Sequence, residues 1–169
     1  MYDQLCERST IKNKYQELLE KLKDRINSTK REYIKIKARK DMELKLWQSK
    51  FFGKPYLLKD QKYPTDDNGN NLYLLAQLNL SQMPDLEFFY PKKGLLQFWV
   101  SDKQLYGLDF KNRTKQNGFK VIFHKEVQED NDKLVQDFSF LSKIQKEKGW
   151  ICEDQDQFAQ FALDFKIDK

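Results

Sequence analysis

The chain has 169 residues, of which 39% are hydrophobic, 14% aromatic and 34% charged, and its net charge is +5. This length fits one domain that buries about two thirds of its unfolded surface, and the mixture of charged and apolar residues argues against disorder. No apolar run reaches the roughly 18 to 20 residues that span a membrane. The first residues also lack an apolar segment of signal-peptide length. We therefore expect one cytoplasmic domain over residues 1–169, without a membrane partner.

The positive charge is concentrated in the first part of the chain. Residues 1–63 carry 17 Lys and Arg against 9 Asp and Glu, whereas residues 64–169 carry 14 against 17. A basic N-terminal half can attract nucleic acid. The basic residues are interrupted by acidic and apolar ones, however, and form no continuous basic run with stacking aromatics. We expect a solvated helix face here and regard nucleic-acid binding as the less favoured alternative.

The first predicted element is an amphipathic helix over residues 10–28. Its apolar residues recur at spacings of three and four, which is the pattern of a helix with one apolar face; they are Ile11, Tyr15, Leu18, Leu19, Leu22 and Ile26. Ser9 or Thr10 is suited to cap its start, and Asn27-Ser28-Thr29 to end it. Such a face can enter a partner's groove, but we expect it to pack on the protein's own sheet.

After residue 30 the apolar period changes to two, as in half-exposed strands. Residues 33–37 and 43–47 alternate in this way, and the short segment between them predicts a hairpin. Residues 66–71, Asp-Asp-Asn-Gly-Asn-Asn, predict a turn. Two nearly continuous apolar runs, 72–80 and 95–100, predict central strands that are covered on both faces.

Two further strands complete the prediction. Residues 119–124 form one, and the C-terminal strand, at about 158–167, alternates apolar and charged residues in a way that suits a sheet edge. The fold class is therefore α+β: a mostly antiparallel β-sheet with an N-terminal amphipathic helix packed on it.

Two glutamines interrupt the central strands. Gln77 and Gln97 each stand in an apolar run, and a buried amide must be satisfied by hydrogen bonds. These amides can pair with each other, hold a loop, or line the floor of a pocket. We expect them to anchor a loop.

No catalytic constellation is recognisable, and no catalytic residue, cofactor or metal site is predicted. The motifs of nucleophile elbows, zinc proteases and phosphate-binding loops are missing from the sequence, and Cys6 and Cys152 have no metal-ligand spacing. His124 is the single histidine, and at the end of a strand we expect it to be a surface residue. Asp109 lies between Leu108 and Phe110, where a carboxylate needs a hydrogen-bond partner; we expect a structural role.

Several motifs together resemble a known family. Ser49-Lys-Phe-Phe-Gly-Lys-Pro-Tyr56 is followed by Leu72-Tyr-Leu-Leu-Ala-Gln-Leu-Asn79, by Gly94-Leu-Leu-Gln-Phe-Trp99 and by Asp102-Lys-Gln-Leu-Tyr-Gly-Leu-Asp109. This order is similar to that of the YwqG-like family, bacterial proteins of unknown function. The family-like core covers about residues 30–145. The resemblance implies a fold and no mechanism.

Two departures from the family pattern bear on partners. Phe52-Gly53 stands where the family commonly has a double glycine, and the chain resembles only the N-terminal half of a two-half family. A one-half protein exposes the surface that the second half covers. The resemblance thus implies either a homodimer that replaces the missing half or a substitute strand from the tail, 161–167.

The leading functional prediction is a non-enzymatic protein-binding module of a regulatory or immunity type. Aromatic residues that anchor interfaces support it: Trp47, Phe52, Tyr56, Phe88, Phe89, Tyr90, Trp99 and Tyr106. The rival is a small-ligand-binding protein or enzyme with a pocket near Gln77, Gln97 and Asp109. The candidate binding residues are Gln77, Gln97, Trp99, Tyr106 and Asp109.

Overall fold

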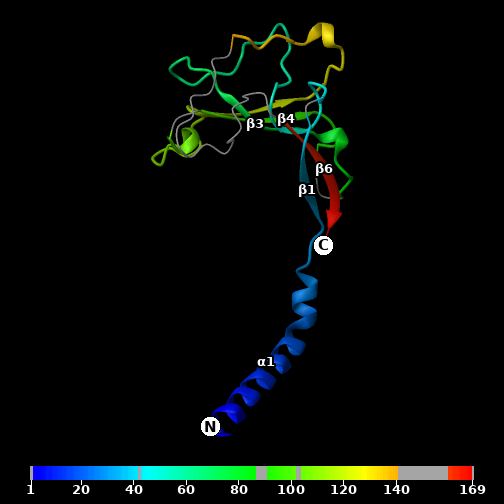
Figure 1. Ribbon diagram of the computed structural model, residues 1–169, viewed down its shortest axis with the longest axis vertical. Helices are drawn as coiled ribbons and strands as arrows, with labels where there is room; N and C mark the ends of the chain where they lie inside the picture. The colour runs from blue at the N-terminus through cyan, green and yellow to red at the C-terminus, as the bar shows by residue number, and fades with distance from the viewer. Residues whose placement is uncertain (1, 42, 87–90, 102–103, 141–159, 169) are drawn as a thin grey trace. The chain divides into compact units, whose positions relative to one another are not determined.

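The computed structural model describes residues 2–41, 43–86, 91–101, 104–140 and 160–168, the side chains of residues 2–14 and 104 excepted. The chain divides into two compact units, residues 1–33 with 168–169, and residues 34–167. Along the described chain, one α-helix precedes six strands, with three short 3-10 helices between strands (Figure 1).

Helix α1 extends from Tyr2 to Ser28, so it begins before the predicted residue 10 and ends where predicted. Hydroxyl groups close its last turn: Ser28 Oγ donates to the carbonyl of Arg25 and Thr29 Oγ1 to that of Ile26, both at 2.7 Å. Four apolar side chains of the predicted stripe are 48–63% exposed: Tyr15, Leu18, Leu19 and Ile26. The packing of this stripe on the sheet stays a prediction.

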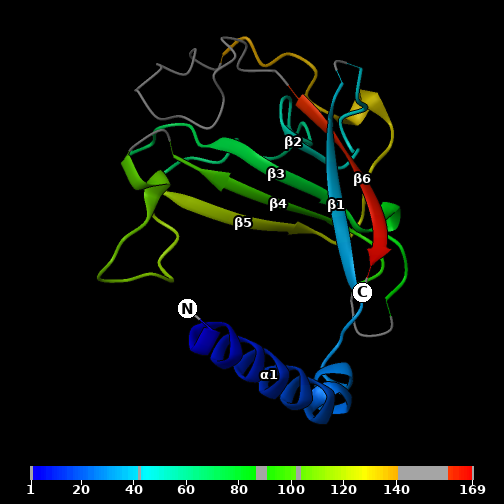
Figure 2. The same cartoon turned by 60° about the horizontal axis from the view of Figure 1, so that its bottom comes forward.

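The strands form one antiparallel sheet in the order β1-β6-β2-β3-β4-β5. Their bounds are β1 Tyr33–Lys40, β2 Lys50–Phe52, β3 Tyr73–Asn79, β4 Leu95–Val100, β5 Phe119–His124 and β6 Gln160–Asp168. Strands β3, β4 and β5 lie side by side, and β1 and β6 cross them steeply (Figure 2). The α+β class and the central position of β3 and β4 are confirmed.

The predicted hairpin between residues 33 and 47 is wrong. Strand β1 continues through the expected turn to Lys40, and residues 43–49 form no strand. The reason is local: Gln48 N–H donates to the carbonyl of Lys45, and Lys45 N–H to Gln48 Oε1 at 2.7 Å. These bonds close a tight turn, and carbonyls of this turn accept hydrogen bonds from side chains of β3. Strand β1 pairs with β6 instead.

The C-terminal strand is confirmed, but its predicted position at the sheet edge is wrong. Strand β6 lies between β1 and β2. Strand β2 has three residues and pairs only with Gln160–Ala162 of β6. The Leu163 N–H still donates to the Ser49 carbonyl at 3.4 Å, and beyond it β6 has no neighbouring strand on this side, which explains why Asp164 can keep a 62% exposed side chain inside a six-stranded sheet.

One face of the sheet, called here the inner face, carries the core. Register places Lys50, Gln77, Gln97 and Ile122 in one row across four strands of this face. Loops cover it and join at a bridge between Leu58 and Leu134. Two buried clusters result: Leu46, Trp47, Tyr56, Leu57, Leu95, Leu134 and Phe138 in one, and Leu72, Leu74 and Trp99 in the other.

Candidate functional site

The two glutamines meet at the centre of the inner face. Gln77 and Gln97 are opposite each other on β3 and β4, and their exposed fractions are 0% and 1%. Gln97 Nε2 donates to Gln77 Oε1 at 3.0 Å. Because each strand alternates its side chains, both amides are directed into the layer between the sheet and its covering loops.

Both amides hold the backbone of Tyr56. Gln77 Oε1 accepts the Tyr56 N–H at 2.8 Å, and Gln97 Nε2 donates to the Tyr56 carbonyl at 2.8 Å. Gln77 Nε2 donates in addition to the carbonyls of Leu46 and Gln48, at 2.7 and 2.9 Å. The prediction that these residues anchor loops is confirmed by these bonds.

The remaining oxygen of the pair reaches two aromatic residues. Gln97 Oε1 accepts from Trp99 Nε1 at 3.3 Å and lies 3.0 Å from His124 Nε2. An amide oxygen only accepts, so the proton of the neutral imidazole resides on His124 Nε2. Burial lowers the pKa of His124 below its ordinary value, which keeps the ring neutral near pH 7. His124 is partly buried, so it is less exposed than expected of a surface residue.

Lys50 is a fully buried lysine in the same row, and its burial is not evident from the sequence. Its Nζ donates to the carbonyls of Lys45 and Lys54, both at 3.1 Å. Burial lowers the pKa of its ammonium group to about 8. Its position opposite Gln77 follows from the pairing of β2 with β3, which the sequence does not reveal. Lys50 thus joins the glutamines in holding the loop over residues 45–56.

Tyr106 and Asp109 lie in a different part of the chain, between β4 and β5. Asp109 Oδ1 accepts the N–H groups of Lys111 and Asn112, at 2.8 and 3.3 Å, which is the bonding of a turn-forming aspartate. Tyr106 is 37% exposed and has a positive φ of 52°. Neither lines the cavity beside Gln97, so no pocket described here brings together Gln97 and Asp109.

The cavity beside Gln97 is small. It has a volume of about 220 Å³, below the roughly 300–1,000 Å³ of typical ligand pockets. Its lining residues are Leu57, Gln61, Lys62, Pro64, Gln97, Ile122 and His124. The amide of Gln97 is already bonded within the protein, as described above, so it has no spare donor for a ligand. This weakens the basis of the ligand-binding alternative.

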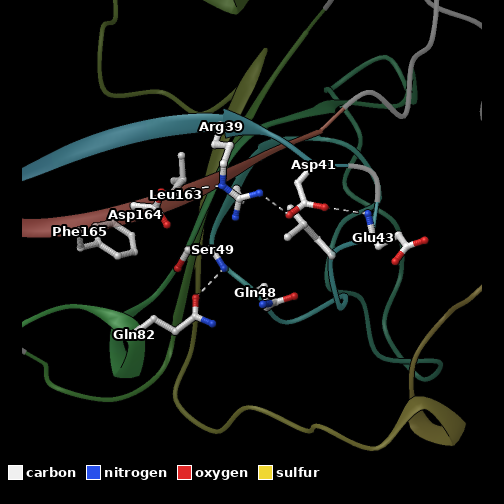
Figure 3. A pocket seen from close by; sticks show the side chains of 11 residues that line it. Arg39, Asp41, Glu43, Gln48, Ser49, Gln82, Leu163, Asp164 and Phe165 are labelled. Atoms are coloured by element: carbon white, nitrogen blue, oxygen red, sulfur yellow. Dashed lines mark hydrogen bonds and ion pairs between the residues drawn. The ribbon is translucent and has the colours of Figure 1, made fainter.

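A larger cavity of about 400 Å³ opens where β1, β6 and the 43–49 segment meet (Figure 3). No local sequence pattern predicts this cavity, because its lining residues come from four separate segments of the chain. Its lining residues are Arg39, Asp41, Glu43, Leu44, Gln48, Ser49, Gln82, Ala162, Leu163, Asp164 and Phe165.

The polar groups of this cavity bind one another. Figure 3 shows Arg39 between Asp164 and Asp41; its Nη1 is 2.9 Å from Asp41 Oδ2, and its Nε is 4.0 Å from Asp164 Oδ2. The Glu43 N–H, and then the Arg39 guanidinium, lower the pKa of Asp41. Gln82 Oε1 accepts the Ser49 N–H at 2.8 Å. These bonds join the segments that line the cavity, which supports a structural role for its polar side chains.

The opposite side of the sheet, called here the outer face, is apolar across β6, β2, β3, β4 and β5. Register places Phe161, Phe51, Ala76, Phe98 and Val121 in one row. Two shorter rows flank it, Leu78-Leu96-Phe123 and Tyr73-Val100-Phe119. None of the residues in these three rows carries a charge.

Within the described part of the chain, the outer face contributes to neither buried cluster. Its residues on β5, Val121 and Phe123, are each 43% exposed. Apolar area that stays in water is unfavourable by about 25 cal/mol per Å², so a contiguous apolar face marks a surface that gains from being covered. The prediction that the central strands are covered on both faces has direct support on the inner face only.

The aromatic residues expected to anchor an interface fall into three groups. Trp47, Tyr56 and Trp99 belong to the core. Phe52 is partly buried, and Tyr106 is exposed. Residues 88–90 lie outside the described residues. The outer-face aromatics Phe98, Phe119 and Phe123 were not singled out from the sequence, because alternation alone does not reveal which face of a strand the loops cover.

Two further observations bear on function. Among the described residues, His, Cys, Asp and Glu side chains form no group of three that could hold a metal ion. A helix with the length and apolar character needed to cross a bilayer does not occur among them either.

A family model described as a domain of unknown function (DUF1963) matches residues 49–168, from just before β2 to the end of β6. No protein with a curated description matches the chain. The matched region contains the glutamine pair, Lys50 and the outer face.

Proposed function

We propose, for a chain that belongs to the DUF1963 family of domains of unknown function, that it is a non-enzymatic protein-binding module whose binding surface is the outer face of the sheet. The observation that carries this proposal is the uncharged, apolar character of that face over five strands, with Val121 and Phe123 each 43% exposed on β5. The YwqG-like proteins are our narrower choice of relatives within this family.

The chemistry of the inner face supports a structural role there. Gln77, Gln97 and Lys50 use their polar atoms on loop carbonyls and N–H groups. A group engaged in this way is not free to bind substrate or move a proton. In a regulatory or immunity-type module the activity consists of occupying a partner, which requires a surface and no reaction centre.

The occupant that fits the outer face is a protein surface rich in apolar side chains. Leu, Val and Phe side chains in several rows offer dispersion contacts and no charge, so charged ligands such as nucleic acid gain nothing there. Binding would remove Phe123 and Val121 from water together with the partly buried residues beside them.

Site-specific photo-crosslinking tests the proposal. A benzophenone amino acid replaces Phe123, on the outer face, and in a matched control it replaces Lys120, which faces the other side of the same strand. We expect a discrete crosslinked protein from position 123 and not from 120, and we expect Val121→Glu to weaken binding of that purified protein at least tenfold. Equal or absent crosslinking at the two positions would overturn the proposal.

A further inference from the structure

Among the described strands, β5 is the last of the sheet and has a neighbour on one side only. The Val121 N–H does not bond to β4; it donates to the side chain of Gln116, at 2.8 Å. In an antiparallel pair, the residues that bond across alternate with residues whose N–H and C=O groups point away. Phe119, Val121 and Phe123 therefore direct their backbone groups away from β4.

This edge lacks the features that usually prevent strand pairing. Its sequence Phe-Lys-Val-Ile-Phe-His contains no proline and a single lysine. Lys120 faces the inner side, so it does not interrupt the apolar side chains of the outer face. The Gln116 amide covers only one of the outward N–H groups, and its own side chain is exposed and free to rotate away.

The edge is also complementary to itself. If two β5 strands run antiparallel about a two-fold axis at Val121, Val121 faces its own copy and Phe119 faces Phe123. All three outward residues then form hydrogen-bonded pairs, with about six bonds in total. Lys120 lies opposite Ile122 in this register, so no like charges face each other.

We infer that β5 pairs with β5 of a second copy in this register, which joins two six-stranded sheets into one and makes the outer face continuous across both copies. The inference goes beyond the proposed function: the second copy binds the β5 edge, and the joined outer face stays available to the protein partner proposed above. An isologous contact of this kind closes after two subunits, so it gives a dimer and no fibre.

Cysteine trapping tests the register in the full chain, with Cys6→Ser and Cys152→Ser as background. In the proposed dimer the two copies of residue 121 lie about 5.5 Å apart between Cα atoms, within disulfide range. Val121→Cys should crosslink under mild oxidation. Phe119→Cys is the matched control: two copies of residue 119 are four positions out of register, roughly 13 Å apart, and should crosslink at least tenfold more slowly.

Light scattering gives the second measurement. The wild type should have about twice the 20.4 kDa mass of one chain, and Val121→Lys should return it to 20.4 kDa. Val121→Pro serves as a second variant, because it removes an N–H that β4 does not use. A wild-type mass of 20.4 kDa at high concentration, with equal crosslinking of the 121 and 119 cysteines, would overturn the inference.

The outcomes separate the two proposals. If the wild type is a monomer but the Phe123 probe captures a different protein, the outer face binds a partner and only the second-copy inference fails. If the wild type is a monomer and the probe captures nothing, both proposals fail.

Discussion

Gln77 and Gln97 hold the same residue from opposite ends: the Tyr56 N–H donates to Gln77 Oε1 and the Tyr56 carbonyl accepts from Gln97 Nε2, each at 2.8 Å. The two amides also bond to each other. Tyr56 is thereby fixed over the centre of the sheet, where its OH accepts the N–H of Gln128 and its ring packs edge-on against His124. Two loops distant in sequence are joined through this one residue.

Replacing Gln77 by Leu should therefore destabilise the fold strongly. The substitution leaves the Tyr56 N–H and the carbonyls of Leu46 and Gln48 without these partners, at about 1 kcal/mol or more for each buried group, or about 3 kcal/mol in total. Urea denaturation measures the loss. Gln61→Leu is the control, since Gln61 is exposed and should change stability by less than about 0.5 kcal/mol.

Gln77→Leu and Gln97→Leu should also be non-additive. Each single substitution breaks the bond between the two amides and one of the two bonds to the Tyr56 backbone. The double variant should therefore lose less unfolding free energy than the sum of the two single losses. Strict additivity would show that the two amides act independently, contrary to the bonding described here.

Because burial lowers the pKa of Lys50, the stability of the fold should rise with pH above about pH 8. The pKa of Lys50 is about 8 in the folded protein against the ordinary lysine value of 10.5, so between these values the unfolded chain binds more protons. The unfolding free energy should increase by about 2 kcal/mol from pH 8 to pH 10 because of this group. Lys50→Met should remove that increase. If the difference in stability between wild type and variant is the same at both pH values, the lysine is not desolvated as described.

His124 makes a spectroscopic prediction. Its Nε2 lies 3.0 Å from Gln97 Oε1, so the Nε2–H tautomer should dominate in nitrogen NMR spectra near pH 7. The folded pKa lies below 6.5, so the unfolded chain binds the proton first, and this group should lower stability as pH falls below about 6.5. Observation of the Nδ1–H tautomer would contradict the assigned bond. In the Gln97→Leu variant the tautomer preference should weaken.

Two glycines with similar backbone angles should respond differently to alanine. Gly107 and Gly69 have φ of +86° and +80°, which costs alanine about 1 kcal/mol at either position. A Cβ on Gly107 would lie 2.0 Å from the Gly118 carbonyl oxygen, whereas Gly69 has nothing within 4 Å. Thermal unfolding should show Gly107→Ala to be the more destabilising by at least about 2 kcal/mol. Equal losses would mean that the loop before β5 does not pack against Gly118.

Local patterns in the sequence determined most of the elements. Apolar runs bounded by turn residues predicted β3, β4 and β5, because a strand in a covered sheet needs such a run whatever its neighbours are. The Asp66 turn was equally local: the carboxylate accepts the N–H groups of Asn68 and Asn70, two and four residues away. A buried amide must be bonded, so even the anchoring role of Gln77 and Gln97 followed from their place in apolar runs.

Only the tertiary structure decided which segments pair and which face is covered. The partner of β1 proved to be β6, more than a hundred residues away, and not the adjacent segment 43–47, whose backbone turns on itself at Lys45 and Gln48. The alternation of β5 equally suits both faces; Ile122 packs against the cluster of Leu72, Leu74 and Trp99 on one side, whereas Val121 on the other side stays exposed. Pairing and burial depend on contacts between residues far apart in the chain, and for those a local pattern holds no information.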